Sequence, residues 1–132
     1  MAWAFYHYVG ANGRDAIKDW IDAQPAGTRK RLKAQLNTRL NELRLADRLE
    51  RANGVGQLRR ECAGLYELIL RVDKIQYRPI GCYGPAKNGE FTLLAGAIEK
   101  DGKFTEPDIC RRAHERAGRI RDKRHVCLHS YD

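Results

Sequence analysis

The chain has 132 residues and a formal net charge of +8, with 25 Lys and Arg against 17 Asp and Glu. This length predicts a single domain over residues 1–132, and a composition of 42% hydrophobic and 32% charged residues excludes wholesale disorder. The longest apolar run, residues 91–98, is far short of the roughly 20 residues that span a bilayer, and the first residues lack a secretory signal pattern. We therefore expect a cytoplasmic protein with no membrane partner.

The first third of the chain predicts a strand followed by two helices. Residues 2–9 are rich in aromatic side chains, which is typical of a strand. Over residues 14–24 apolar side chains recur at helical spacing until Pro25 closes the segment. From Thr28 leucines recur every three or four positions, which predicts a longer helix that ends before Asn53 and carries basic side chains on its outer faces.

The rest of the chain changes to the period of strands and then returns to a helix. Residues 66–72 alternate apolar and polar side chains, and residues 75–82 follow after a short turn, as in a hairpin. Residues 91–98 are almost uniformly apolar, which predicts a central strand covered on both faces. A basic helix opens near Pro107 and runs to about residue 120. The sequence thus predicts an α+β domain with an antiparallel sheet, an N-terminal helical pair and a C-terminal helix.

The positive charge is concentrated in two segments. Residues 28–51 hold eight bases and three acids, and residues 111–124 hold seven bases and two acids, so each carries +5. A polyanion such as RNA would interact mainly there, because each neutralised phosphate releases condensed counterions. The RNA-binding candidates are basic residues of the sheet region and of the C-terminal helix: Arg71, Lys103, Arg112, Arg116 and Arg119.

The four cysteines form no C-x-x-C pair, and in a cytoplasmic chain we expect free thiols. Cys110 and His114 lie four residues apart on the predicted helix, and Cys127 and His129 alternate near the C-terminus. These side chains could hold a zinc ion, but none of the pairs has a characteristic zinc-ligand spacing. A buried cysteine and tail histidines are the simpler interpretation, so we expect no metal and no cofactor.

Three motifs occur in this strand context: residues 64–68 (Gly-Leu-Tyr-Glu-Leu), the pair Tyr77-Arg78 and residues 93–100 (Leu-Leu-Ala-Gly-Ala-Ile-Glu-Lys). Their order and spacing resemble the RelE/ParE superfamily of toxins from type II toxin–antitoxin pairs, most of all its HigB-like, phage-derived branch, over about residues 3–120. The resemblance implies a RelE-like fold and a cognate antitoxin partner that often carries a helix-turn-helix. Active members bind the ribosome and cut messenger RNA in its A site, whereas ParE-like members act on gyrase.

The resemblance also assigns candidate catalytic residues. RNA cleavage by the 2′-hydroxyl needs a base, cations for the charge on the phosphate, and an acid for the leaving oxygen. Arg78 stands where ribonucleolytic members place a phosphate-stabilising arginine, and Lys100 matches the region of a second basic residue. Glu67 is a candidate base.

Several positions depart from the pattern of active relatives. Glu67 and Ile69 replace residues that are basic there, and the acid/base residues that relatives carry after Lys103 have no clear counterpart. Strand alternation places Tyr77 and Arg78 on opposite faces, so they are not expected to act on one phosphate. Arg78 could instead pair with Glu67 across the hairpin.

Two functions therefore remain open. The first is a toxin that acts as a ribosome-dependent messenger RNA endonuclease of weak activity. The second is a non-catalytic RelE-fold module that binds an antitoxin, RNA or the ribosome. Lys100 and Lys103 flank a turn, and the simpler interpretation of both is that they are solvated turn residues. In either case the apolar residues 91–98 favour a partner chain that covers a neighbouring surface, and a homo-oligomer is also possible.

Overall fold

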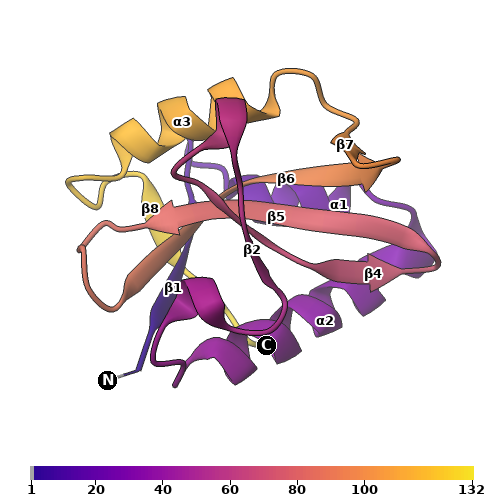
Figure 1. Ribbon diagram of the computed structural model, residues 1–132, viewed down its shortest axis with the longest axis horizontal. Helices are drawn as coiled ribbons and strands as arrows, with labels where there is room; N and C mark the ends of the chain where they lie inside the picture. Colours follow the sequence, from indigo (N-terminus) through magenta and orange to yellow (C-terminus); the bar gives the residue numbers. More distant parts are fainter. Residues whose placement is uncertain (1) are drawn as a thin grey trace.

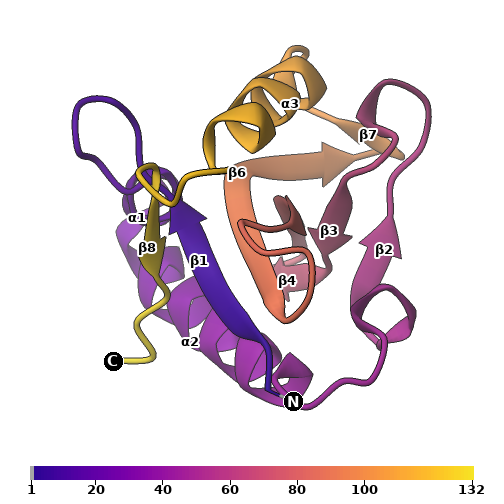
Figure 2. The same cartoon turned by 90° about the vertical axis from the view of Figure 1, so that its left-hand side faces the viewer.

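The computed structural model describes residues 2–132, which form one mixed sheet with helices on both of its faces (Figures 1 and 2). None of the helices in this range has the length and apolar character needed to cross a membrane. In chain order the elements are β1 (Ala4–Tyr8), α1 (Ala16–Asp22), α2 (Ala26–Leu43), η1 (Leu49–Arg51), β2 (Val55–Gln57), η2 (Arg60–Cys62), β3 (Tyr66–Leu68), β4 (Leu70–Val72), β5 (Ile75–Tyr83), β6 (Glu90–Lys100), β7 (Lys103–Phe104), α3 (Ile109–Arg119) and β8 (Val126–Leu128).

The strands lie in the order β2-β3-β5-β6-β1-β8, and β4 and β7 extend the sheet by pairing with β5 and β6. β1 runs parallel to β6, with Phe5 opposite Phe91, whereas the other named strand pairs are antiparallel. The expectation of a purely antiparallel sheet is therefore wrong at β1. The spacing of hydrophobic residues identifies a strand, but it specifies neither the neighbouring strand nor whether the two run parallel or antiparallel.

The helices cover the two faces of the sheet as separate layers. α1 and α2 pack on one face, where the leucines of α2 are buried against Phe5 and Leu93, and α3 packs on the other face against Ile80 and Leu94. β6 is accordingly covered on both faces, as its apolar sequence predicts. Because the covering elements belong to this chain, the apolar character of residues 91–98 no longer argues for a partner chain.

The predicted strand over residues 66–72 is broken into β3 and β4. At the break, the backbone N–H of Ile69 donates to the carbonyl of Gly54 at 2.9 Å, and the Ile69 side chain is 39% exposed. The turn that follows β4 has positive φ at both Asp73 and Lys74, as a tight hairpin turn requires. β2 and β8 were not predicted, since three residues are too few to show a period.

The cysteines differ from expectation at two positions. Cys62 in η2 and Cys110 in α3 form a disulfide, with their Cα atoms 4.9 Å apart, whereas Cys82 and Cys127 are free thiols. The expectation of free thiols is wrong for the first pair because sequence spacing did not reveal that η2 packs against α3.

Candidate functional site

The Arg78 side chain lies on the sheet face that α3 covers, and Tyr77 is buried on the opposite face, as strand alternation predicts. Arg78 is only 5% exposed. Its Nε lies 3.4 Å from Oε1 of Glu67, and its Nη2 lies 3.2 Å from Oε2 of Glu99. Its Nη1 donates to the backbone carbonyls of Leu70 and Tyr77 at 3.2 and 3.1 Å.

The register of three strands brings these charges together. Arg78 on β5 stands opposite Ala97 on β6, so Glu99 is its diagonal neighbour on the same face. Glu67 on β3 stands opposite Ile80, two residues from Arg78. The ion pair of Arg78 with Glu67 that the sequence allowed is therefore present, and Glu99 adds a second carboxylate that the sequence did not indicate.

The Arg78 guanidinium is already neutralised by protein groups. Burial raises the pKa of Glu67, while the nearby Arg78 charge lowers it and Glu99 raises it further. A phosphate could reach Arg78 only by displacing these carboxylates, at the cost of leaving them unpaired in a largely buried place. The geometry is that of a structural ion-pair network, with Glu67 as a partner of Arg78 rather than as a base poised for a substrate.

A cleft of about 450 Å³ lies beside this network, between β7, η2 and the start of α3. Its charged lining consists of four acids and three bases: Glu61, Glu67, Glu99, Glu106, Arg59, Arg60 and Lys103. Lys103 stands directly opposite Lys100 across the β6–β7 turn, and both are exposed. Arg71 is exposed on β4, opposite Gln76. Two of these acids, Glu67 and Glu99, pair with Arg78, so the cleft and Arg78 together hold four acids and four bases. Without a net positive charge the cleft is a poor binding site for a phosphate.

The basic residues of α3 are largely engaged by other protein groups. Arg112 pairs with Asp108 at 3.0 Å. Arg116 donates to the carbonyl of Leu94 at 2.8 Å and lies over the ring of Tyr8, 5.0 Å from its centroid. Arg119 donates to the Tyr8 hydroxyl at 3.2 Å. The predicted RNA contacts of this helix would compete with these interactions.

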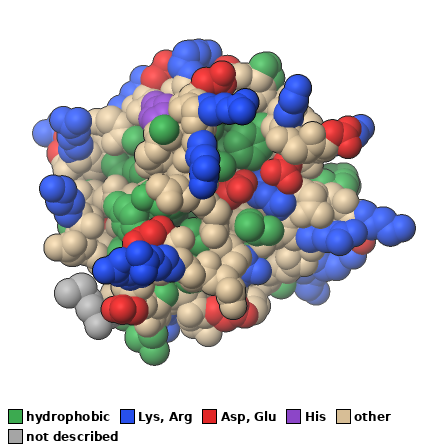
Figure 3. All heavy atoms as spheres, in the orientation of Figure 1, with side chains coloured by type: hydrophobic (Ala, Val, Ile, Leu, Met, Phe, Trp, Pro, Cys, Tyr) green, Lys and Arg blue, Asp and Glu red, His purple; other side chains and the backbone are tan. Residues whose placement is uncertain are grey.

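The other basic segment, residues 28–51, is less compensated. Arg31 pairs with Asp73, and Arg39 with Glu42 at 3.8 Å. Within residues 2–132 its other six bases have no carboxylate within ion-pair distance: Arg29, Lys30, Lys33, Arg44, Arg48 and Arg51. On the face seen in Figure 3, Lys and Arg form separate groups with acids between them, so the charge there is not one continuous patch.

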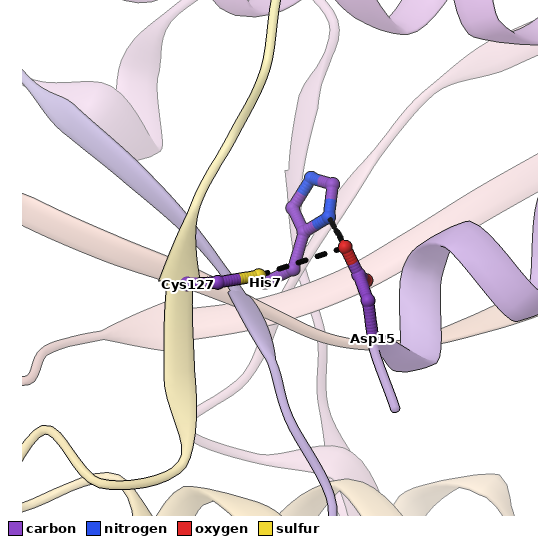
Figure 4. A group of neighbouring side chains, drawn as sticks. All are labelled: His7, Asp15 and Cys127. Carbon is purple, nitrogen blue, oxygen red and sulfur yellow. Dashed lines mark hydrogen bonds and ion pairs between the residues drawn. The ribbon is translucent and has the colours of Figure 1, made fainter. Parts of the chain in front are cut away.

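A polar cluster that the sequence interpretation did not assemble lies on the α1/α2 side of the sheet (Figure 4). His7 on β1 stands directly opposite Cys127 on β8, and His129 follows two residues later on the same face. Asp15 caps the N-terminus of α1 and accepts from the backbone N–H groups of Ile17 and Lys18. Nδ1 of His7 lies 3.0 and 2.9 Å from the two Asp15 oxygens, and Sγ of Cys127 lies 3.6 Å from Oδ2 of Asp15.

The cluster continues as a chain of hydrogen bonds toward the C-terminal residues. Nε2 of His7 lies 2.7 Å from Nδ1 of His129, and Nε2 of His129 lies 2.7 Å from Oδ1 of Asn37 on α2. Nδ2 of Asn37 donates to the carbonyl of Tyr131 at 3.1 Å. Burial, the charge of His7 and the charge of Lys33 lower the pKa of His129 to about 3, so its ring is neutral.

The acid and the thiol of the cluster are also perturbed. Burial would raise the pKa of Asp15, but the hydrogen bond and charge of His7, with the hydrogen bonds from the Lys18 backbone and Cys127, together lower this pKa to about 2. Burial, together with the charge and hydrogen bond of Asp15, raises the pKa of Cys127 to about 11. At neutral pH the cluster therefore holds a carboxylate and a protonated thiol.

The four residues considered as zinc ligands from the sequence do not lie in one place. Cys110 is in the disulfide, and Nε2 of His114 lies 2.9 Å from the carbonyl of Glu61. Cys127 and His129 lie on the same face, two residues apart, and their partners are Asp15 and His7, respectively. A local signal for those partners was missing, because more than 100 residues separate them from the C-terminal strand.

Comparison with models of protein families, with curated proteins and with solved structures found no match for this chain.

Proposed function

We propose that the chain is a RelE-like binding module of a toxin–antitoxin pair, which binds RNA without cleaving it at the sheet. The proposal rests on the three motifs of the sequence and on a helical pair packed against a sheet, which is the arrangement that the resemblance implies. Within this family, catalysis at Arg78 would require a guanidinium that is available to a phosphate.

The observation that carries the proposal is the enclosure of Arg78 between Glu67 and Glu99. A transition-state phosphate gains from a guanidinium only if that guanidinium can approach it without first losing other partners. Together, the cleft and Arg78 hold four acids and four bases, so no net positive charge attracts RNA there. Both features favour the binding module over the messenger RNA endonuclease.

The uncompensated bases between Arg29 and Arg51 support RNA binding. Six positive side chains that pair with no carboxylate of the described residues can each contact a phosphate without breaking an ion pair. The affinity for a single-stranded RNA should then fall steeply with salt, with a slope of about −0.7 per phosphate neutralised. A cognate antitoxin is part of the same proposal, and co-expression with the product of a neighbouring helix-turn-helix gene should yield a stable complex.

The test compares cleavage and binding in parallel. Messenger RNA on programmed ribosomes should remain intact with the wild type, with Arg78→Ala and with Ile69→Arg, which introduces the cation common in active relatives. Fluorescence anisotropy with a labelled single-stranded RNA should show salt-dependent binding by the wild type. Cleavage by the wild type that Arg78→Ala abolishes would establish the endonuclease instead. Binding that does not change with salt would remove the electrostatic basis of the proposal.

A further inference from the structure

The directions of the hydrogen bonds around His7 determine which of its ring nitrogens carries a proton. Asn37 donates through Nδ2 to the carbonyl of Tyr131, so its Oδ1 must accept from Nε2–H of His129. With its ring proton on Nε2, His129 has an unprotonated Nδ1, which can only accept. It follows that Nε2 of His7 carries the proton that it donates to His129.

This assignment leaves Nδ1 of His7 facing two other electron-rich atoms. The Asp15 carboxylate lies 2.9 Å from Nδ1, and Sγ of Cys127 lies 3.6 Å from the same carboxylate oxygen. One ligand atom from each of the three residues lies within 4.8 Å of the other two. Two acceptors as close as Nδ1 and a carboxylate oxygen repel unless a cation lies between them, and this cation can be a proton or a metal ion.

We propose that Nδ1 of His7, the carboxylate of Asp15 and Sγ of Cys127 bind a zinc ion. Imidazole nitrogen, carboxylate oxygen and thiolate sulfur are the three zinc donors of proteins. Ligand atoms around a tetrahedral zinc ion lie about 3.2–3.7 Å apart, given bonds of about 2.0–2.3 Å. The Cys127–Asp15 distance already fits, and the His7–Asp15 distance needs to widen by a few tenths of an ångström.

The surroundings supply the outer support that zinc-bound histidines usually have. The second ring nitrogen of such a histidine donates to a fixed acceptor, which orients the ring. Here Nε2–H of His7 donates to His129, which Asn37 holds in turn. Asp15 is held by the N-terminus of α1, and β1 and β8 hold His7 and Cys127 directly opposite each other. Rigid elements thus position all three ligands before the metal arrives.

The charge balance also suits a divalent cation. When Cys127 binds as a thiolate, its charge and that of the Asp15 carboxylate balance the two charges of the ion.

The site has an entry path and an open position. His7 and Asp15 line a cavity of about 510 Å³, whose other walls include Lys30, Lys33 and Leu128. Three protein ligands leave the fourth position of the tetrahedron open for water or a small anion. Catalytic zinc sites have such an open position, whereas structural zinc sites have four protein ligands. The cavity gives that position access to solvent.

The experiment titrates tag-free protein, kept oxidised so that the Cys62–Cys110 disulfide is intact, with Co²⁺ and then with Zn²⁺. One equivalent of Co²⁺ should produce a sulfur-to-cobalt charge-transfer band in the near ultraviolet, and Zn²⁺ should abolish it. Cys127→Ser should eliminate the band and weaken zinc binding at least about tenfold. Asp15→Asn should also weaken binding, while asparagine retains the N-cap of α1.

Cys82→Ser is the matched control, because this second free thiol is buried in the core on the α3 side of the sheet. It should retain the cobalt band and the zinc affinity of the wild type. Circular dichroism checks that each variant is folded, and calorimetry in two buffers measures the protons that zinc releases. Absence of the band from the wild type at one equivalent, or an equal band in Cys127→Ser, would overturn the proposal.

Discussion

Replacing Arg78 by alanine removes the guanidinium that pairs with Glu67 and Glu99. The side chains are 6%, 15% and 31% exposed, respectively, so water compensates little for the loss at Glu67 and more at Glu99. At an effective dielectric constant of about 20, unit charges 3.4 Å apart attract by roughly 5 kcal/mol, which desolvation offsets in part. Removal of one partner from a buried pair typically costs about 3–5 kcal/mol, because the other charge stays buried.

This cost should appear as a fall in Tm of about 10–15 °C for a chain of this length. Thermal and urea unfolding of the wild type and Arg78→Ala measure it. Arg71→Ala is the matched control, since this arginine is exposed on the neighbouring strand β4. Its free energy of unfolding should stay within about 0.5 kcal/mol of the wild type.

A double-mutant cycle with Glu67→Gln isolates the pair. The two changes should be non-additive by more than about 1 kcal/mol, because each removes the same contact. A Tm for Arg78→Ala within about 2 °C of the wild type, together with additive changes, would refute the reasoning. Arg78 would then be free of its carboxylates, and the argument against a phosphate contact there would fail.

Three further predictions follow from other parts of the molecule. Reduction of the Cys62–Cys110 disulfide should lower the free energy of unfolding by about 4 kcal/mol, since the bond closes a segment of 48 residues. Urea unfolding with and without reductant measures this change. The stability of a Cys62→Ser variant should not depend on reductant. Lys30→Glu should weaken RNA binding more than Arg111→Glu, because Arg111 already pairs with Asp108 and Glu115; equal losses of affinity by anisotropy would contradict it. The pKa of Asp15 falls from 3.8 to about 2 on folding. The ionised carboxylate therefore adds at most about 2 kcal/mol to the free energy of unfolding, since the group is partly exposed. This stabilisation is present above about pH 4 and is lost toward pH 2. Acid unfolding should therefore be less pH-dependent between pH 4 and pH 2 in Asp15→Asn, and identical profiles would exclude this stabilisation.

The sequence alone determined the type of the long elements, although α2 ends at Leu43 rather than just before Asn53 and the alternating residues 66–72 form two strands. The leucines of α2, the apolar run of β6 and the basic helix α3 were all predicted, because burial on one or both faces leaves a repeating pattern in the chain. Strand alternation also predicted that Tyr77 and Arg78 face opposite ways. These are local properties, which each segment carries irrespective of its neighbours.

Only the tertiary structure decided which segments meet. The parallel pairing of β1 with β6, the disulfide between η2 and α3 and the second carboxylate at Arg78 each join residues far apart in the chain. The His7–Asp15–Cys127 cluster depends on β8, a strand of three residues whose register against β1 places two sequence-distant donors opposite each other. A period specifies the face on which a side chain lies, whereas the partner across that face depends on topology and register, which one sequence does not encode locally.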